Sequence, residues 1–548
     1  MITPERFDAI VVGAGFAGLY SLHKLRGMGL QTVVLETADD VGGTWYWNRY
    51  PGARCDAQSM LYSFSFDDAL DAEWTWSERY ATQPEILRYL NFVADRLDLR
   101  RGIRFGTTVK SAVFDADTDR WTISTASGGQ FEAQFLIMAT GALSVGRLPD
   151  IAGIDRFGGE SYHTGSWPHE GVDLAGKRVA VIGTGSSGVQ TIPLAAETAT
   201  HVTVFQRTPS YVVPAMNAQH TPEQIADFRN NRAVLRERAR WGEVRGIGDL
   251  HASYLPPPGR SALSVDEVER RDVYERSWNV GGAVIMTAFT DLMTDEAANQ
   301  TAADFFRDKI ASIVKDPETA ARLTPTDYPI FSKRLCVGTN YYESFNRENV
   351  ALVDAGRHPI IEITPRGIRT TEQEHEFDTI IYATGFDALT GALSAINIRG
   401  VGGGSLREAW AAGPRTYLGV AVAGYPNMFT ITGPGSPSVL SNVVVSIEQH
   451  VEWIADLITY AAGKGARRIE VDAAAQDEWT DRVTAAAADT LFMKGKSWYL
   501  GANIPGKPRV FMPFVGGVGP YRQICDDIAK AGYPGIRFEG PREAGTAV

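Results

Sequence analysis

The stretch Asp8–Gly29, "DAIVVGAGFAGLYSLHKLRGMG", decides the fold of the chain around it. A run of β-branched residues is followed by the pattern G-x-G-x-x-G, with its glycines at Gly13, Gly15 and Gly18, and then by an amphipathic segment. This order predicts a strand, a tight glycine-rich turn and a helix, and the run "QTVVLE" after it predicts a second strand. The stretch therefore predicts the start of a doubly wound dinucleotide-binding domain.

A second copy of this arrangement lies in "KRVAVIGTGSSGVQTIPLAAE", followed by "HVTVFQR", with glycines at Gly183, Gly185 and Gly188. In each copy the first glycine permits the tight turn, the second admits a pyrophosphate, and the third lets the helix pack on the strand. The helix N-terminus offers free N–H groups and the positive end of its dipole to the phosphates. Two such units predict two nucleotide sites in one chain.

The residue that ends the second strand of each unit indicates which nucleotide binds. In the first unit it is Glu36, 23 residues after Gly13, whose carboxylate accepts hydrogen bonds from ribose hydroxyls and repels a 2′-phosphate. In the second unit it is Arg207, 24 residues after Gly183, followed by Thr208. A guanidinium and a hydroxyl suit a 2′-phosphate. The sequence therefore predicts FAD in the first site, and NADPH rather than NADH in the second.

Size and composition restrict the remaining classes of function. The 548 residues predict two to four domains, and the net charge of −12 argues against a nucleic-acid partner. No apolar run reaches the roughly 18–20 residues of a membrane span, and "MITPERFD" does not resemble a signal peptide. The three cysteines are far apart and lack metal-site spacing. We expect a soluble cytoplasmic protein with no metal, no membrane contact and no obligatory protein partner.

The predicted fold class is α/β, with two Rossmann-like dinucleotide-binding domains and a mostly helical insert. The expected FAD domain is discontinuous, as is the NADPH domain, and the insert interrupts the latter. The ranges are 1–144 and 388–548 for FAD, 145–212 and 333–387 for NADPH, and 213–332 for the insert.

Helix-start signals support the helical insert. Thr221, Pro222 and Gln224 form the pattern of a capping box with proline at the first helical position, and Ser264 with Glu267 repeats the device. Two roles for this insert are equally open: it is an addition at the surface, or it forms part of the substrate pocket.

The cysteine pattern also bears on the class of flavoprotein. A disulfide reductase needs a redox-active cysteine pair beside the first domain, and the sequence has no C-x-x-C. With neither a thiol acceptor nor a grouped metal-ligand set, dioxygen is the natural oxidant.

A peptide between the two glycine patterns carries a family resemblance. Phe157, Gly159, His163, Trp167 and Pro168 have the spacing F-x-G-x-x-x-H-x-x-x-W-P, which resembles the fingerprint of the type I Baeyer–Villiger monooxygenases, a class B group of flavoprotein monooxygenases. The segment "GGTWYWNRYPGARCD" resembles a second family pattern, and the similarity extends over nearly the whole chain. Through "ATGFDALTG", "GPGSPSVLSN" and "SWYLGANIPGKPRVFMPF" it is most similar to the branch of phenylacetone and steroid monooxygenases.

The resemblance implies a sequence of reactions. NADPH reduces FAD, dioxygen adds at flavin C4a, and the deprotonated peroxide attacks a ketone, so that one oxygen atom is inserted to give an ester or lactone. The near alternative is a flavin monooxygenase that oxygenates nitrogen or sulfur. The distant alternative is non-catalytic, a flavoprotein that signals NADPH occupancy or merely leaks peroxide.

The same resemblance implies the site residues. Arg334 in "SKRL" matches the active-site arginine, whose permanent charge would keep the peroxide anionic, and Asp56 matches the carboxylate that orients it. Lys333 is expected at the 2′-phosphate and Trp498 at the nicotinamide ribose. The remaining cofactor contacts are expected at Trp45 and at the strand ends Thr140 and Asp387.

We interpret the fingerprint peptide as a coupling element. Phe157, Gly159, His163 and Trp167 would pack the linker between the two nucleotide domains, which has to change position between flavin reduction and ketone entry. His163 is therefore expected to be structural rather than a catalytic acid or base.

Overall fold

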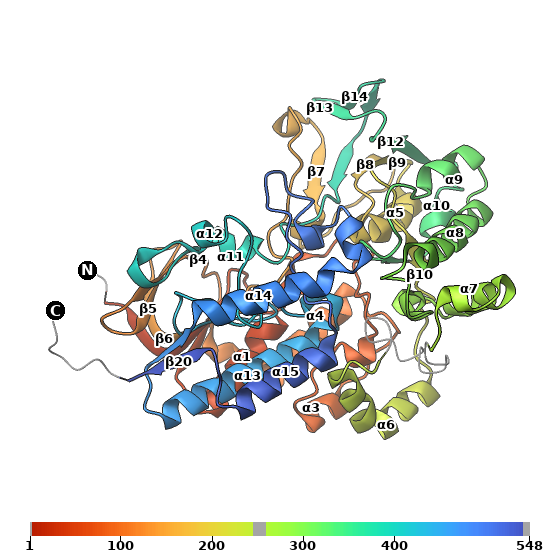
Figure 1. Ribbon diagram of the computed structural model, residues 1–548. Coiled ribbons are helices and arrows are strands. Elements are labelled where there is room, and N and C mark those ends of the chain that lie inside the picture. Colours follow the sequence, from red (N-terminus) through yellow and green to blue (C-terminus); the bar gives the residue numbers. More distant parts are fainter. Residues whose placement is uncertain (1–2, 245–258, 541–548) are drawn as a thin grey trace.

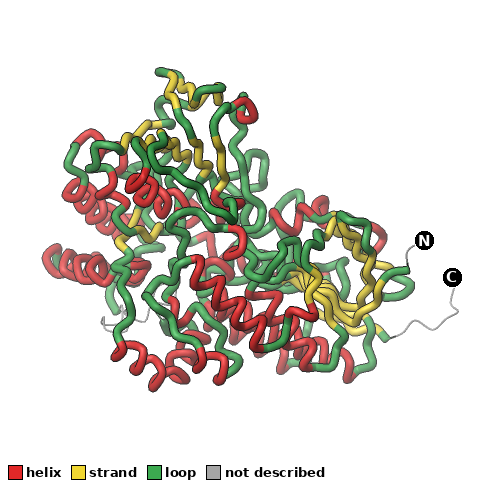
Figure 2. Tube along the Cα trace, turned by 180° about the vertical axis from the view of Figure 1, so that it is seen from behind, coloured by secondary structure: helices red, strands yellow, loops and turns green. Residues whose placement is uncertain are grey.

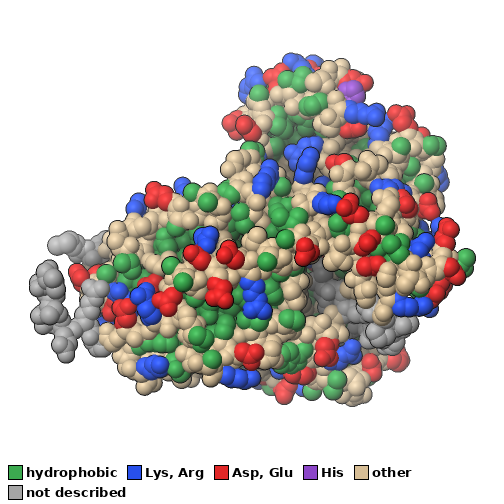
Figure 3. All heavy atoms as spheres, in the orientation of Figure 1, with side chains coloured by type: hydrophobic (Ala, Val, Ile, Leu, Met, Phe, Trp, Pro, Cys, Tyr) green, Lys and Arg blue, Asp and Glu red, His purple; other side chains and the backbone are tan. Residues whose placement is uncertain are grey.

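The computed structural model describes residues 3–244 and 259–540. These residues form two α/β bodies, the lower body and the upper lobe of Figure 1, with a group of helices beside them. Seen from behind in Figure 2, the strands again gather in two separate groups, each with helices around it. On the face shown in Figure 3, acidic and basic side chains are interspersed rather than segregated by sign.

The first body is built on an eight-stranded sheet in the order β17-β4-β5-β6-β1-β2-β3, with β18 also paired to β6. β1 runs parallel to both of its neighbours, β2 and β6, as expected for a doubly wound unit. The strands are β1 (Glu5–Val12), β2 (Thr32–Leu35), β3 (Ile103–Arg104), β4 (Val109–Asp115), β5 (Arg120–Thr125), β6 (Gln130–Met138), β17 (Asn397–Arg399) and β18 (Met428–Thr430). A separate antiparallel pair joins β19 (Arg468–Val471) to β20 (Ile536–Glu539).

The first body also contains helices. They are α1 (Phe16–Gly27), α2 (Thr44–Trp47), α3 (Asp68–Glu73), α4 (Gln83–Arg96), α11 (Gly391–Ala395), α12 (Leu406–Ala409), α13 (Val443–Gly463), α14 (Ala473–Ala488) and α15 (Val518–Lys530). The expectation that α1 is amphipathic is wrong, because side chains from Phe16 to Leu22 are buried in succession. The helix lies between the sheet and α13, so it has no broad solvent face.

The second body contains a parallel sheet in the order β12-β9-β8-β16-β7. Its strands are β7 (Glu160–His163), β8 (Arg178–Ile182), β9 (His201–Gln206), β12 (Val350–Asp354) and β16 (Thr379–Tyr382), and its helices are α5 (Ser186–Thr198) and α10 (Tyr341–Ser344). An antiparallel sheet of β13 (Ile360–Thr364), β14 (Gly367–Thr370) and β15 (Glu374–Glu376) extends the lobe. Two glycine-loop α/β bodies confirm the predicted fold class.

Two of the passages of the chain between the bodies, an outward crossing at Gly146 and a return crossing at Phe386, lie against each other. Gly146 on the outward crossing bridges Phe386 on the return crossing in antiparallel fashion. The Arg147 N–H donates to the Gly385 carbonyl at 2.9 Å. The linker between the bodies is therefore a paired ribbon rather than two independent strands.

The helical insert contains α6 (Pro222–Arg240), α7 (Glu267–Val280), α8 (Glu296–Ile313) and α9 (Pro317–Leu323). The capping box of Thr221 and Gln224 is confirmed, with both reciprocal hydrogen bonds present. The second expected cap is wrong: α7 is capped by Asp266, whose side chain accepts from the Glu269 N–H. Ser264 instead ends the 3₁₀ turn Ala262–Ser264, and its hydroxyl donates a hydrogen bond to the Ser261 carbonyl.

A two-stranded parallel sheet joins the insert to the second body. It consists of β10 (Val212–Pro214) and β11 (Cys336–Gly338). Side chains alternate across it, since Val212 and Cys336 belong to the core around α5, whereas Val213 and Val337 belong to the core of α7 and α8. The strand β11 thus fixes the segment just before it, at Lys333 and Arg334, where these two cores meet.

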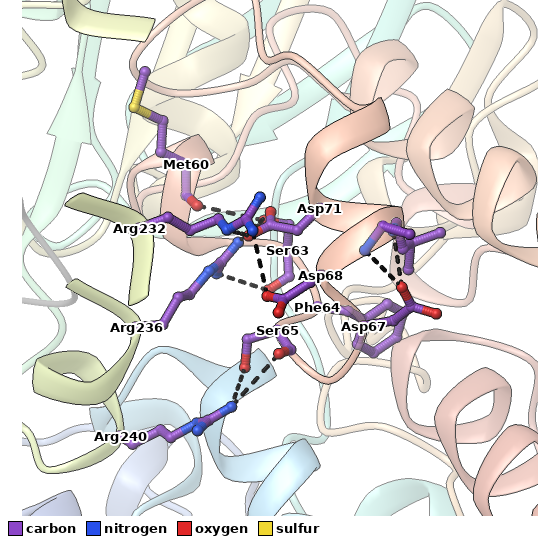
Figure 4. Close-up of polar contacts among 12 residues, drawn as sticks. Met60, Ser63, Phe64, Ser65, Asp67, Asp68, Asp71, Arg232, Arg236 and Arg240 are labelled. Carbon is purple, nitrogen blue, oxygen red and sulfur yellow. Dashed lines mark hydrogen bonds and ion pairs between the residues drawn. The ribbon is translucent and has the colours of Figure 1, made fainter. Parts of the chain in front are cut away.

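The first helix of the insert, α6, packs on the first body instead. Figure 4 shows Arg232, Arg236 and Arg240 projecting from one side of α6 towards Asp71 and the Ser63–Ser65 loop. Arg236 donates to the Asp71 carboxylate at 2.8 Å and to the Ser63 hydroxyl at 2.7 Å. Both charged side chains of the Arg236–Asp71 pair are more than nine-tenths buried. A buried charge is tolerated only when it is paired, so this contact holds α6 in place.

Three smaller findings concern the remaining sequence predictions. Among the described helices, none is long and apolar enough to cross a membrane. Within residues 3–244 and 259–540, no cluster of three or more histidine, cysteine or acidic side chains could hold a metal ion. Cys55, Cys336 and Cys525 are all buried and reduced.

We predict that Arg236→Met destabilises the protein, because it leaves the Asp71 carboxylate buried without its main partner. The free energy of unfolding in urea should fall by about 3 kcal/mol. Arg238→Met on the same helix is the control, since its side chain is exposed and its ion pair with Glu243 is long, at 3.9 Å. Equal stability of the two variants would contradict a clamping role for the buried pair.

Candidate active site

A cavity of about 1200 Å³ lies where the two bodies meet. Gly13 and Gly15 of the first glycine loop line it, as do Gly183 and Gly185 of the second. The two predicted nucleotide sites therefore open into one shared space.

The first glycine loop has the form that a pyrophosphate requires. Gly13 has φ +103°, and a β-carbon on it would lie 2.6 Å from the Ala139 carbonyl oxygen. A β-carbon on Gly18 would lie 1.8 Å from the Gly13 carbonyl oxygen, so the helix approaches the strand only because glycine is there. α1 starts after Gly15, which adds no side chain over the N–H groups of the first turn. These features fit FAD at this loop.

Glu36 lies at the wall of the cavity, at the end of β2. Its carboxylate accepts hydrogen bonds from the backbone N–H groups of Ala14 at 2.5 Å and Ala38 at 2.7 Å. Burial raises the pKa of Glu36, and these hydrogen bonds oppose that shift. The carboxylate is thus held at the glycine loop with lone pairs left for ribose hydroxyls.

The second glycine loop repeats the arrangement. Gly183 has φ +114°, and a β-carbon on it would lie 2.4 Å from the Ala383 carbonyl oxygen. Nothing lies within 4 Å of the β-carbon position of Gly185, whereas that of Gly188 meets the Gly183 carbonyl oxygen at 2.2 Å. The middle glycine therefore leaves open space at the start of α5, where a second dinucleotide fits.

Basic side chains gather beside this second loop. Arg207 is exposed on the cavity wall next to Thr208. Lys333 places its ammonium 3.7 Å from the centre of the Tyr328 ring. Burial lowers the pKa of Lys333, and the positive charges of Arg207 and Lys496 lower it further, while Asp327 opposes them. The three cations are thus neighbours, and such a group is completed by an anion such as a 2′-phosphate.

Arg334 and Asp56 form a bidentate ion pair at the cavity wall. Arg334 Nε donates to Asp56 Oδ2 at 2.8 Å, and Nη2 donates to Oδ1 at 2.7 Å. The remaining nitrogen, Nη1, donates to the Val439 carbonyl at 2.7 Å. Burial would lower the pKa of Arg334, but the Asp56 carboxylate raises it above its ordinary value, so the guanidinium stays charged.

The predicted aromatic contacts also reach the cavity. Trp45 lines it and donates its indole N–H to the Tyr62 hydroxyl at 3.2 Å. Trp498, from a distant segment of the chain, also lines the cavity, and its ring centre is 4.4 Å from that of Tyr499. Thr140 is a lining residue as well, whereas Asp387 lies on the return crossing and pairs with Lys507 Nζ at 2.5 Å.

The fingerprint peptide packs against the paired crossings. His163 ends β7, its Nδ1 accepts from the Gly165 N–H at 3.0 Å, and its ring meets Phe386 edge-on at 5.9 Å. A β-carbon on Gly146 would lie 2.8 Å from the His163 ring. Burial lowers the pKa of His163, so its ring is neutral near pH 7. The histidine thus contacts both crossings, at Gly146 and at Phe386.

The other fingerprint residues pack in the second body, around the sheet that β7 belongs to. Trp167 is buried in the core around α5, with its ring 5.4 Å from that of Tyr162. Phe157 packs on the other face of the sheet. Gly159 is required by close approach, because a β-carbon there would lie 2.4 Å from the Asp378 carbonyl oxygen.

Sequence reasoning missed residues in the segment 496–507. Arg147 Nη1 donates to the Asn503 carbonyl, and Asn503 Nδ2 donates to the Phe386 carbonyl at 2.8 Å. This segment therefore fastens to both crossings. Lys496 was also missed; its neighbour Trp498 was singled out only by resemblance, and nothing in the local pattern of Lys496 marks a site.

Comparisons with known proteins agree with this geometry. A family model described as flavin-binding monooxygenase-like matches residues 8–238. A Baeyer–Villiger monooxygenase of Pseudooceanicola batsensis is 44% identical, covering 97% of this chain and 96% of its own. A phenazine N-monooxygenase of Lysobacter antibioticus is also 44% identical with the same coverage. The solved structure of an oxidized steroid monooxygenase bound to NADP has a TM-score of 0.92 and 49% identity, covering 97% of this chain and 99% of its own.

These relatives match along nearly the whole chain and not only at the glycine loops. The match covers the segments that hold Asp56, Arg334 and Trp498 as well as both nucleotide sites. The family resemblance noted in the sequence is therefore confirmed. The chain belongs to the Baeyer–Villiger monooxygenases, within the flavin-binding monooxygenases.

Proposed function

We propose that the protein is an FAD- and NADPH-dependent monooxygenase that inserts one oxygen atom of dioxygen into a ketone, giving an ester or lactone. The observation that carries the proposal is the Arg334–Asp56 pair, placed on the wall of the one cavity that both glycine loops share.

The chain holds the two cofactors by separate sets of groups. Gly13 and Gly15 with the start of α1 receive the FAD pyrophosphate, and Glu36 receives a ribose. The start of α5 receives the NADPH pyrophosphate, and Arg207 with Lys333 receives its 2′-phosphate. When bound, NADPH and FAD supply the two electrons with which dioxygen is activated.

Arg334 supplies a fixed positive charge to the reaction. Negative charge develops on the ketone oxygen when a nucleophilic oxygen attacks the carbonyl carbon, and a preorganised cation stabilises that charge. Because its pKa is raised, the guanidinium does not lose its proton, so it acts as a charge and not as an acid. Asp56 fixes the plane of the guanidinium and balances its charge before substrate enters.

Part of the cavity wall is apolar and favours an apolar substrate. Ile431, Val439, Val443 and Ile447 all line the cavity. Such a wall excludes water from the reacting atoms and buries the hydrocarbon part of a ketone.

N-oxygenation is the second candidate, and the 44% identical phenazine N-monooxygenase is the observation that favours it. An amine nitrogen is itself a nucleophile and needs an electrophilic oxygen, whereas a ketone carbonyl needs an anionic one. A charged arginine stabilises the anionic form, so Arg334 favours the ketone. Wild-type enzyme given matched ketones and aromatic amines, with product masses measured, should yield ester or lactone; N-oxide alone would favour the second candidate.

We also propose the domain limits expected from the sequence, with one refinement. The FAD domain comprises 1–144 and 388–548, the NADPH domain 145–212 and 333–387, and the insert 213–332. Within the insert, α6 associates with the FAD domain through the Arg236–Asp71 pair, and α7–α9 associate with the NADPH domain. Cytoplasmic location and independence from a protein partner stay predictions.

Arg334→Met should abolish ester formation while NADPH oxidation continues. Loss of one preorganised charge that stabilises a developing anion lowers product formation roughly 100- to 1000-fold. The measurements are product mass and NADPH absorbance. Arg399→Ala is the control, because that side chain is exposed and donates to the Gly403 carbonyl at 3.0 Å, whereas Arg399 does not line the cavity. Ester formation at the wild-type rate by Arg334→Met would remove the arginine from the mechanism.

Arg207→Ala should raise the KM for NADPH roughly 10- to 150-fold, because a charged hydrogen bond to the 2′-phosphate is lost. The KM for NADH, which has no such phosphate, should stay nearly constant. Arg357→Ala in the same body serves as control, since its side chain is 82% exposed. A parallel increase in both KM values would refute the phosphate assignment.

His163→Ala should slow flavin reduction and raise peroxide release, because it removes the ring packed between the two crossings. Stopped-flow absorbance follows the first quantity and a peroxidase assay the second. Wild-type values of both would leave the histidine without a coupling role.

A further inference from the structure

We propose that His450 is a positioning residue for Arg334, and that it holds the loop 432–439 so that the Val439 carbonyl meets the guanidinium. The inference rests on the proposed function, in which Arg334 is the charge that directs the reaction. His450 lies on α13, is 1% exposed and is not among the residues that line the cavity. Its influence on the reaction therefore passes through the loop.

Both ring nitrogens of His450 have a partner. The Thr432 N–H donates to Nδ1 at 3.0 Å, and Nε2 lies 2.8 Å from the Tyr521 hydroxyl oxygen. Because the Tyr521 hydroxyl donates its own proton to the Leu418 carbonyl, the hydrogen between tyrosine and histidine belongs to Nε2. Burial lowers the pKa of His450 to about 3, which agrees with a neutral ring whose Nδ1 is left to accept.

The backbone around this histidine is strained at three residues that are not glycine. The angle φ is +58° at Leu418, +52° at Thr432 and +42° at Ser438. Such a conformation is costly for these residues and persists only where neighbouring contacts hold it. Tyr521 holds the Leu418 carbonyl. His450 holds the Thr432 N–H, and the Ser438 hydroxyl donates to the Thr432 carbonyl at 3.0 Å.

The loop 432–439 brings one hydrogen-bond acceptor to Arg334. Ser438 begins a 3₁₀ turn, and the next residue, Val439, accepts from Arg334 Nη1 at 2.7 Å. Thr432 and Val439 both line the cavity. A series of hydrogen bonds and one peptide link thus joins the His450 ring to the Arg334 guanidinium.

Asp56 and Val439 hold different edges of that guanidinium. Asp56 accepts from Nε and Nη2, whereas Val439 accepts from Nη1. The carboxylate ends a side chain that can rotate, but the carbonyl belongs to the backbone, whose place the loop decides. The pose of the arginine therefore depends on the residue that keeps the loop in its strained form.

His450→Leu and His450→Asn form the main comparison. Leucine removes the acceptor, whereas the asparagine amide oxygen lies two bonds from the β-carbon, as Nδ1 does in histidine, and accepts from the Thr432 N–H. In His450→Leu the rate of ester formation should fall roughly 5- to 10-fold, as expected for one lost hydrogen bond. The KM for NADPH and the rate of flavin reduction should stay within about twofold of wild type. His450→Asn should recover most of the ester-forming rate.

Gln449→Leu is the matched control. Gln449 is the preceding residue of α13, is 3% exposed, and its amide has no hydrogen-bond partner among the residues that the structure describes. This substitution also replaces a buried polar side chain by leucine but does not release the loop, so the variant should match wild type in every measurement. An equal loss of ester formation in Gln449→Leu would overturn the inference, because it would show a general effect of changing the helix.

Crystal structures of the variants test the geometry itself. In His450→Leu the Val439 carbonyl should leave Arg334 Nη1, and in His450→Asn it should remain there. An unmoved carbonyl in His450→Leu would overturn the inference, as would equal losses of ester formation in the two variants. If wild-type enzyme forms no ester from any ketone, the proposed function fails, while these structures still decide whether His450 sets the place of the carbonyl.

Tyr521→Phe replaces His450→Leu if that variant yields no folded protein. The phenyl ring keeps its packing against Trp479 and Phe514, whereas the His450 Nε2–H loses its acceptor. Ester formation should again fall while flavin reduction stays within about twofold of wild type. Ester formation at the wild-type rate, with the Val439 carbonyl in place, would overturn the inference.

Discussion

The structure depends on one ion pair between residues 278 positions apart, Arg334 and Asp56. Arg334 stands just before β11, where the core of α5 meets that of the insert helices, and Asp56 belongs to the first body. Because a guanidinium that is about four-fifths buried needs a partner, the pair requires the two bodies to meet at this point. The same requirement places a permanent positive charge on the wall of the cavity that both glycine loops open into.

The paired crossings are the second constraint. Gly146 and Phe386 bring the outward and return strands together, and His163 packs against both. The segment with Trp498 attaches to the same place through Asn503. We infer that a change in the angle between the bodies would move this part of the cavity wall, and a coupling role for the fingerprint peptide stays a prediction.

The spacing of residues along the sequence predicted those features that one short segment of the chain forms. The glycine loops, Glu36 and Arg207 follow from the strand–turn–helix rule. One short segment forms each nucleotide-binding unit, and one side chain at the end of its second strand selects the nucleotide. The resemblance pointed to Arg334 and Asp56, whose meeting no local pattern predicts. The cap at Asp266 was missed because Ser264 offers an equivalent pattern two residues earlier, and only the backbone path decides between them.

The central claim is that this cation directs one atom of dioxygen into a ketone. The most direct measurement supplies ¹⁸O₂ and a ketone to the wild-type holoenzyme and determines the mass of the product together with the NADPH consumed. The account predicts an ester or lactone that carries one ¹⁸O atom for each NADPH oxidised. NADPH consumption that yields only labelled hydrogen peroxide, with the ketone recovered unchanged, would contradict it.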